Sequence, residues 1–226
     1  MKLSILVFIF FMASLVSAQT DSTFIQFKVN ADIASRYIWR GSDYFNSAAI
    51  QPDMELIYKD KIGIGAWGSF SFSNQPIQEN DLFVFANIHH FSIYVYDYFY
   101  MNQIANNAYF NYDSKKTGHT LSADLSYKIS ENFPLTILAS YNFWGNDTMH
   151  SQYFEISYQF EKHPVQIFMG ATTDKGWYGN SLGVVNTGIQ LSREIKVSEQ
   201  LSIPFDIQCI VNPQKENIYL VAIFHL

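Results

Sequence analysis

Two pairs of histidine and serine residues are the places where this sequence could support nucleophilic chemistry. His119 lies three residues before Ser122, and His150 lies directly before Ser151. A serine nucleophile needs a base within hydrogen-bonding reach, but residues one or three positions apart on a strand point to opposite faces. We therefore expect no catalytic residues and no enzymatic activity.

Metal chemistry has equally little support. His89 and His90 are adjacent, but no partners for them stand at a spacing typical of a zinc site. Cys209 is the only cysteine, which excludes a disulfide framework and a thiolate cluster within the chain. We expect neither a bound metal nor a cofactor.

Charged residues inside apolar segments carry more information. Residues 24–41 read FIQFKVNADIASRYIWRG, with Lys28, Asp32, Arg36 and Arg40 among aromatic and aliphatic neighbours. Odd-numbered positions of this run are mostly apolar and even-numbered positions mostly polar. This period of two predicts a long strand over 24–40 with one apolar and one polar face.

The same alternation recurs along the chain. Apolar and polar residues also separate by face in segments 119–127, 135–143, 153–160 and 203–211. In segment 92–100 both faces are largely apolar or aromatic, so its phase stays open. Repeated strands with one apolar and one polar face are typical of a barrel wall with lipid outside and water inside.

The fold class predicted from these segments is all-β, a single antiparallel up-and-down transmembrane β-barrel of about twelve strands, with ten as an alternative. Pro52 and Pro204 lie in two of the strands, where each removes a ladder hydrogen bond. The predicted strands are 24–40, 48–58, 62–72, 80–90, 92–101, 119–129, 134–144, 151–161, 164–173, 182–193, 201–211 and 217–226.

The connections alternate in length, with short ones at 59–61, 90–92, 131–133 and 161–163 and longer polar ones between them. Outer-membrane barrels combine short periplasmic turns with longer outer loops. Loop 102–118 is the longest, and we expect it to fold over the outer mouth.

The N-terminus and the composition indicate the compartment. Residues 1–18 have the charged start, apolar centre and small-residue end of a cleaved signal peptide, which leaves 19–226 as the barrel in the cell outer membrane. No later run is apolar enough for a transmembrane helix.

The formal net charge of the chain is −6. Because the sequence also has no basic cluster, we expect no nucleic-acid partner.

A soluble sandwich or lipocalin-like barrel would show the same period with the faces reversed. The aromatic content of 17% and charged content of 15% favour the membrane alternative. So does the terminal segment 218–226, IYLVAIFHL, which has an apolar face up to the last residue.

The run SRYIWRGS at 35–42 resembles the start of the TorF-type porins, which have a comparable Ser-x-Tyr-x-x-Arg-Gly-x-Ser run in their first hairpin. The stretches VNTGIQLSREI (185–195), LSIPF (201–205) and NPQKENIYLV (212–221) are similar to uncharacterised bacterial outer-membrane barrel proteins of the same group. The resemblance implies a porin-like protein without catalytic residues.

A wet lumen would receive the charged side chains of the polar faces, and in it Arg36 would lie about opposite Asp53. These residues form an ion-pair network that braces the barrel, or a net acidic lining that favours cations and neutral solutes. The candidates are Lys28, Asp32, Arg36, Arg40, Asp53, Glu55, Asp81, Asp97, Asp124, Glu155 and Asp206.

Trp67 and Trp144 have an inward phase, which makes them candidates for stacking on a solute; anchoring at the membrane interface is the alternative. The expected partners are outer-membrane lipids and small polar solutes, and the oligomeric state stays open. The predicted function is a porin or channel for small solutes. The alternative is a non-conducting structural or adhesion barrel whose outer loops, chiefly 102–118, bind a partner.

Overall fold

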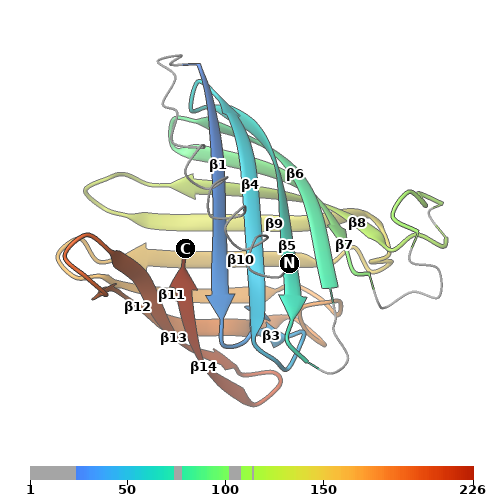
Figure 1. The fold of residues 1–226 in the computed structure, drawn as a ribbon. Helices are drawn as coiled ribbons and strands as arrows, with labels where there is room; N and C mark the ends of the chain where they lie inside the picture. The colour runs from blue at the N-terminus through green and yellow to red at the C-terminus, as the bar shows by residue number, and fades with distance from the viewer. Residues whose placement is uncertain (1–23, 74–77, 102–107, 114) are drawn as a thin grey trace.

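The protein is a closed twelve-stranded antiparallel barrel (Figure 1). The computed structural model describes residues 24–73, 78–101, 108–113 and 115–226, so the expected leader at 1–18 lies outside the described residues. The barrel strands are β1 (Ile25–Ala34), β4 (Ala49–Tyr58), β5 (Ile62–Ser71), β6 (Gln78–Ile88), β7 (Phe91–Phe99), β8 (His119–Lys128), β9 (Leu135–Gly145), β10 (Gln152–Gln159), β11 (Val165–Thr172), β12 (Gly183–Lys196), β13 (Ser202–Asn212) and β14 (Asn217–His225).

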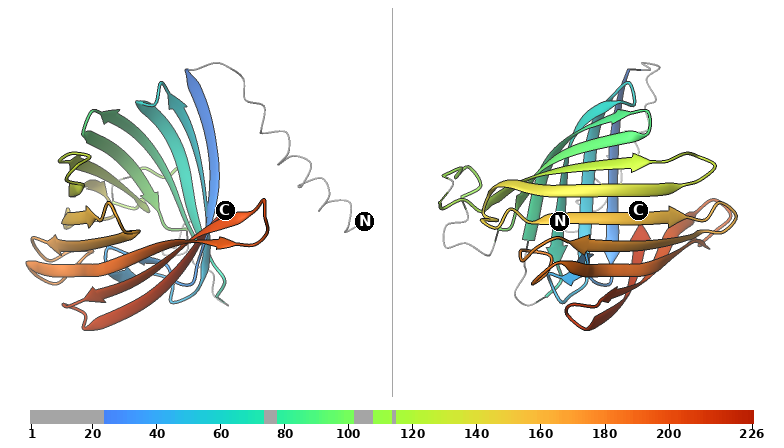
Figure 2. Two further views of the ribbon diagram at one scale, coloured as in Figure 1. Left: turned by 90° about the vertical axis from the view of Figure 1, so that its left-hand side faces the viewer. Right: turned by 180° about the vertical axis from the view of Figure 1, so that it is seen from behind.

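Each barrel strand pairs with the next one along the chain, and β14 pairs with β1 to close the wall. The predicted all-β fold with twelve up-and-down strands is confirmed. Figure 1 shows β1, β4 and β5 nearly upright and β9 and β10 nearly horizontal across the molecule, and Figure 2 shows the same wall from the side and from behind. The closing ladder is short and pairs Asp32, Ile33 and Ala34 of β1 with His225, Phe224 and Ile223 of β14.

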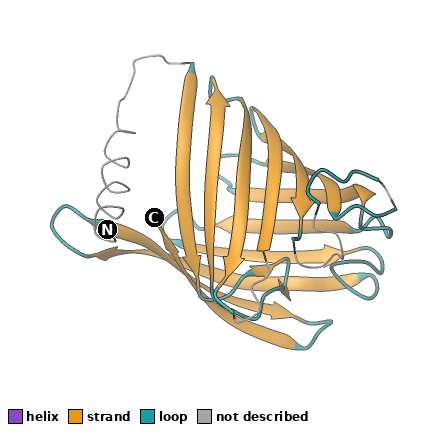
Figure 3. Cartoon of the chain, turned by 45° about the vertical axis from the view of Figure 1, so that its right-hand side comes forward, coloured by secondary structure: helices purple, strands orange, loops and turns teal. Residues whose placement is uncertain are grey.

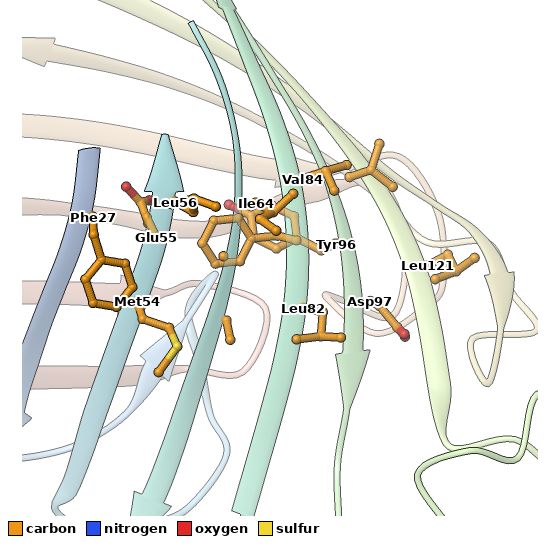
Figure 4. Close-up of a pocket in the computed structure, with 14 residues that line it drawn as sticks. Phe27, Met54, Glu55, Leu56, Ile64, Leu82, Val84, Tyr96, Asp97 and Leu121 are labelled. Atoms are coloured by element: carbon orange, nitrogen blue, oxygen red, sulfur yellow. The ribbon is translucent and has the colours of Figure 1, made fainter. Parts of the chain in front are cut away.

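The two faces of the wall differ as the sequence period requires. Along β1, Phe27 and Val29 point outward and are more than half exposed, whereas Asn30 faces Asp53 across the β1–β4 ladder on the inner side. Apolar side chains from β1 and from β4 to β8 line a shallow groove of about 550 Å³ on the outer wall, and Figure 4 shows Phe27, Met54 and Leu82 there. Exposed apolar side chains of this kind occur along all twelve barrel strands.

Pro52 stands within β4 without shifting its register. The β4–β5 ladder is interrupted at Gln51 and Pro52, and it resumes with Asp53 opposite Trp67 in the same register as Ile50 opposite Phe70. The Gln51 side-chain amide donates to the Ser69 hydroxyl at 3.3 Å. This side-chain hydrogen bond joins β4 to β5 directly beside Pro52, where the proline lacks a backbone donor.

The interior is polar in places and packed with aromatic side chains in others. Ile57, Phe83 and Phe85 form one buried cluster against Trp67, Tyr94 and Tyr96. Figure 3 shows the described chain as strands and connecting loops. None of its segments is a helix of the length and apolarity needed to cross a membrane.

Candidate functional site

The segment between β1 and β4 folds into the barrel. β1 ends at Ala34, and a short hairpin of β2 (Ile38–Trp39) and β3 (Ser42–Asp43) follows. The strand predicted over 24–40 is therefore too long. Ala34 pairs with Ala49, the first residue of β4, so the chain beyond Ala34 has no neighbour on that side of the sheet. We call residues 35–48 the inner hairpin.

The tip of the inner hairpin is a two-residue turn. Arg40 and Gly41 have φ values of +50° and +75°, as a type I′ turn between two strands requires. A Cβ at Gly41 would lie 2.0 Å from the Val185 carbonyl oxygen, and the Asn212 side-chain amide donates to the Gly41 carbonyl at 2.9 Å. The tip of the inner hairpin therefore packs closely against β12 and β13.

Arg40 is the central polar contact of the inner hairpin. Its Nη2 donates to the Asp124 carboxylate at 2.7 Å, and its Nη1 donates to the Ser140 hydroxyl at 2.8 Å and to the Tyr178 hydroxyl at 2.6 Å. Ser140 in turn donates to the other Asp124 oxygen at 2.5 Å. Only 7% of the Arg40 side chain is exposed, so this is a buried ion pair with additional hydrogen bonds, the arrangement that compensates desolvation.

Aromatic rings surround the same guanidinium. The Arg40 Cζ lies 4.6 Å from the ring centroid of Trp39, 4.7 Å from that of Tyr153 and 5.0 Å from that of Tyr178. Tyr178 comes from the loop between β11 and β12, so two loops meet inside the barrel. Cation–π contacts at these distances add to the ion pair.

A cavity of about 370 Å³ lies between the inner hairpin and the wall formed by β4 to β8. Its lining combines aromatic rings with carboxylates, and among the described residues Arg40 is the only basic one that lines it. The lining residues are Tyr37, Trp39, Arg40, Asp53, Glu55, Trp67, Asp81, Phe83, Tyr94, Tyr96, Tyr98 and Asp124.

Two predicted lumen acids of this cavity lie on β4. Asp53 accepts a hydrogen bond from the Asn30 side-chain amide at 3.4 Å. Glu55 stands across the ladder from Lys28 and, among the described residues, forms no ion pair with it. Trp67, a predicted stacking candidate, lines the same cavity and packs against Tyr37 with ring centroids 5.5 Å apart.

Arg36 does not face Asp53, contrary to the prediction. Its Nη1 lies 2.7 Å from the Asp43 carboxylate, within the inner hairpin, and 39% of its side chain is exposed. The reason is that β1 stops before Arg36, which leaves the register of the β1–β4 ladder.

Three further predicted acids lie elsewhere on the inner face. Asp32 accepts from His225 Nδ1 at 2.7 Å, and His225 Nε2 lies 3.2 Å from Asp206, so these side chains connect β1, β14 and β13. Glu155 accepts from the Tyr153 hydroxyl and from the Asn186 side-chain amide. These contacts tie neighbouring strands together.

Asp97 lies on the outer face, not in the lumen. It pairs with Leu82 on β6 and Leu121 on β8, and Figure 4 shows it beside these two residues. The phase of β7 is set by Tyr94, Tyr96 and Tyr98, whose rings turn inward and stack on one another.

Asp97 is covered by part of loop 102–118. It accepts from the Tyr112 hydroxyl at 2.8 Å and lies 2.7 Å from His119 Nδ1. Desolvation and the Asp97 carboxylate raise the pKa of Tyr112, so the phenol stays protonated and donates. Residues 102–107 and 114 lie outside the described residues. The described residues of the loop thus contact the outer wall, and the inner hairpin occupies the lumen.

Trp144 also lies outside, because the β8–β9 ladder contains an irregularity. Leu121 pairs with Trp144 but Ser122 pairs with Asn142, so one extra residue of β9 is inserted there and the alternation changes phase. Trp144 stacks with Tyr112 at a centroid distance of 6.2 Å. It cannot contribute to a stacking surface in the lumen.

Several inner residues were not predicted. Glu79 is 1% exposed on β6, where the predicted strand began one residue later, at 80. The regular spacing of Tyr94, Tyr96 and Tyr98 is a signal that could have fixed the phase of β7. For Tyr178 and His225 no sequence pattern signals the contacts that they make.

No family model and no curated protein matches this chain. Within the described ranges, no group of three or more histidine, cysteine, aspartate or glutamate side chains could hold a metal ion. The candidate site is therefore defined by geometry alone: the inner hairpin around Arg40 and the cavity beside it.

Proposed function

We propose that this protein is an outer-membrane barrel that conducts small cationic or neutral solutes. The apolar outer wall supports a membrane setting, because a soluble barrel would place such side chains in its interior. Nine of the twelve barrel strands have 9 to 11 residues, the length of transmembrane strands tilted by about 45°. Outer-membrane lipids would contact this wall.

The lining of the cavity is the observation that carries the transport proposal. Asp53 and Glu55 face the cavity, and Asp81 and Asp124 line it as well, whereas Arg40 is the one basic residue there. Arg40 is paired with Asp124 at 2.7 Å, so acidic charge prevails. Rings of carboxylates favour cations in channels.

We infer that this conformation is the closed state of the channel. The inner hairpin lies in the lumen next to the cavity, and it would leave or rearrange for a solute to pass. We include membership of the TorF-type porins in the same proposal, since the SRYIWRGS run that resembles them forms this hairpin.

A non-conducting structural barrel is the second candidate, and the Arg40 contacts favour it. The Arg40 guanidinium has one carboxylate, two hydroxyls and three rings around it. These contacts fix the inner hairpin to the inside of the barrel wall. In that function the outer loops, chiefly 102–118, would bind a partner.

Planar-bilayer recording of the purified, folded protein tests the two candidates. We expect ion steps with a cation-selective reversal potential in a KCl gradient. The double variant Asp53→Asn with Glu55→Gln should move that potential toward zero, and Glu131→Gln, an exposed acid in the turn after β8, should not. If neither the wild type nor Gly41→Ala, which should release the inner hairpin, shows ion steps, the channel function is contradicted.

A further inference from the structure

Two buried acids of β6 have no basic partner. Glu79 is 1% and Asp81 is 4% exposed, and neither forms an ion pair within the part of the chain that the structure describes. The Asp81 carboxylate accepts the Phe99 backbone N–H at 3.1 Å through Oδ1, which leaves Oδ2 without a hydrogen bond from a described residue. Residues 74–77 and 102–107 contain no lysine or arginine.

Buried carboxylates without a counter-ion are unfavourable, since desolvation is then not compensated. Asp81 also lines the 370 Å³ cavity together with Asp53 and Glu55. Four carboxylates thus border one cavity. Arg40, the only basic residue among its described lining residues, is already paired with Asp124, so the other three have no ion-pair partner within the described chain. A cationic ligand would supply the missing charge.

The remaining walls of the cavity are aromatic. Tyr94, Tyr96 and Tyr98 form a stack with centroid distances of 5.5 and 5.2 Å and interplanar angles of 11° and 10°, and Trp67 and Phe83 also line the cavity. Aromatic faces bind organic cations, quaternary ammonium groups above all. A bare metal ion would need converging ligands, and no such group occurs among the described residues.

We propose that this cavity is a binding site for a small organic cation of the alkylammonium type. Its volume is at the lower end of the range for small-molecule pockets, about 300–1,000 Å³, which fits a compact ligand. The carboxylates would compensate the charge and the rings would contact the alkyl groups. The inference deepens the proposed function, because the ligand is one of the cations that the channel would admit.

Isothermal titration calorimetry of the folded protein in detergent, with tetramethylammonium chloride as the probe, tests the site. We expect saturable binding at one site, with neutral tert-butanol and potassium chloride giving none. The double variant Asp53→Asn with Glu55→Gln should weaken binding about tenfold or more, and Trp67→Leu should weaken it as well, through the lost cation–π contact. Glu131→Gln is the matched acid-to-amide control and should bind as the wild type does.

Circular dichroism verifies that each variant is folded, and Asp53→Asn alone provides a milder change at a partly exposed position. No saturable binding to the wild type, equal binding of tert-butanol, or unchanged binding by the folded double variant would overturn the site. Conductance without tetramethylammonium binding would remove the site and leave the channel function. Tetramethylammonium binding without conductance would keep the binding site and remove the channel function.

Discussion

The contrast between Arg36 and Arg40 shows how position decides what a charged residue contributes. Both were predicted as lumen residues of one strand. Arg36 forms a half-exposed pair with Asp43, and Arg40 forms a buried pair with Asp124 at the same 2.7 Å distance. Exposed pairs contribute little because water and salt screen them, whereas removing one partner of a buried pair leaves an uncompensated charge.

Substitution of Arg40 should therefore destabilise the folded barrel far more than substitution of Arg36. We expect Arg40→Ala to lower the free energy of unfolding by about 3–5 kcal/mol, the range for breaking a buried ion pair. Arg36→Ala should lower it by about 0–1 kcal/mol, as for an exposed pair. Urea unfolding in detergent measures both, and equal effects would contradict the role given to Arg40.

At the scale of elements, the inner hairpin is the part of the fold with the most direct bearing on function. Its tip contacts Val185 of β12 and Asn212 of β13, and its turn depends on positive φ at Arg40 and Gly41. Its strands β2 and β3 form a sheet of their own that is separate from the barrel ladder, so the hairpin can leave its position without unfolding the wall.

Gly41→Ala should release the inner hairpin. The added Cβ would lie 2.0 Å from the Val185 carbonyl oxygen, and the residue has a φ of +75°, so the tip cannot keep its place. We expect more frequent or longer openings in planar-bilayer recordings.

Gly68→Ala on β5 is the control for this change, since its Cβ would come no closer than 3.0 Å to any atom and its φ is not in the left-handed region. Identical open probabilities for both variants and the wild type would show that the hairpin does not close the lumen.

At the scale of the whole molecule, the proposed membrane setting gives the two faces of the barrel wall different environments, lipid outside and water inside. Val29 and Asn30 are neighbours on β1, yet Val29 faces outward with 58% exposure and Asn30 faces the lumen. A charge on the outer wall of a membrane barrel is costly near the bilayer centre, whereas a charge in a wet lumen is not.

Val29→Arg should therefore destabilise the barrel in lipid vesicles by about 2–4 kcal/mol, the cost of arginine at the bilayer midplane. Asn30→Arg should change it much less, because its side chain stays in water near Asp53. Denaturant unfolding in vesicles, followed by tryptophan fluorescence, measures the difference. The reverse order would indicate that the outer wall faces water.

The sequence determined the number of strands and the face of most side chains. A side-chain period of two is a local property of extended backbone, and an apolar face forms wherever a strand lies between two different environments. For this reason Asp53, Glu55, Trp67 and Glu155 could be assigned to the inner side from their spacing alone.

Only the tertiary structure decided where the alternation of inward and outward side chains ends or changes phase. β1 ends at Ala34 because the partner strand β4 begins at Ala49, and an inserted residue in β9 turns Trp144 outward. Asp97 faces outward because the tyrosines of β7 stack inside the barrel. Register, bulges and the packing of a hairpin into a lumen depend on contacts between residues far apart in the chain, such as Arg40 and Asp124, and no local pattern records those contacts.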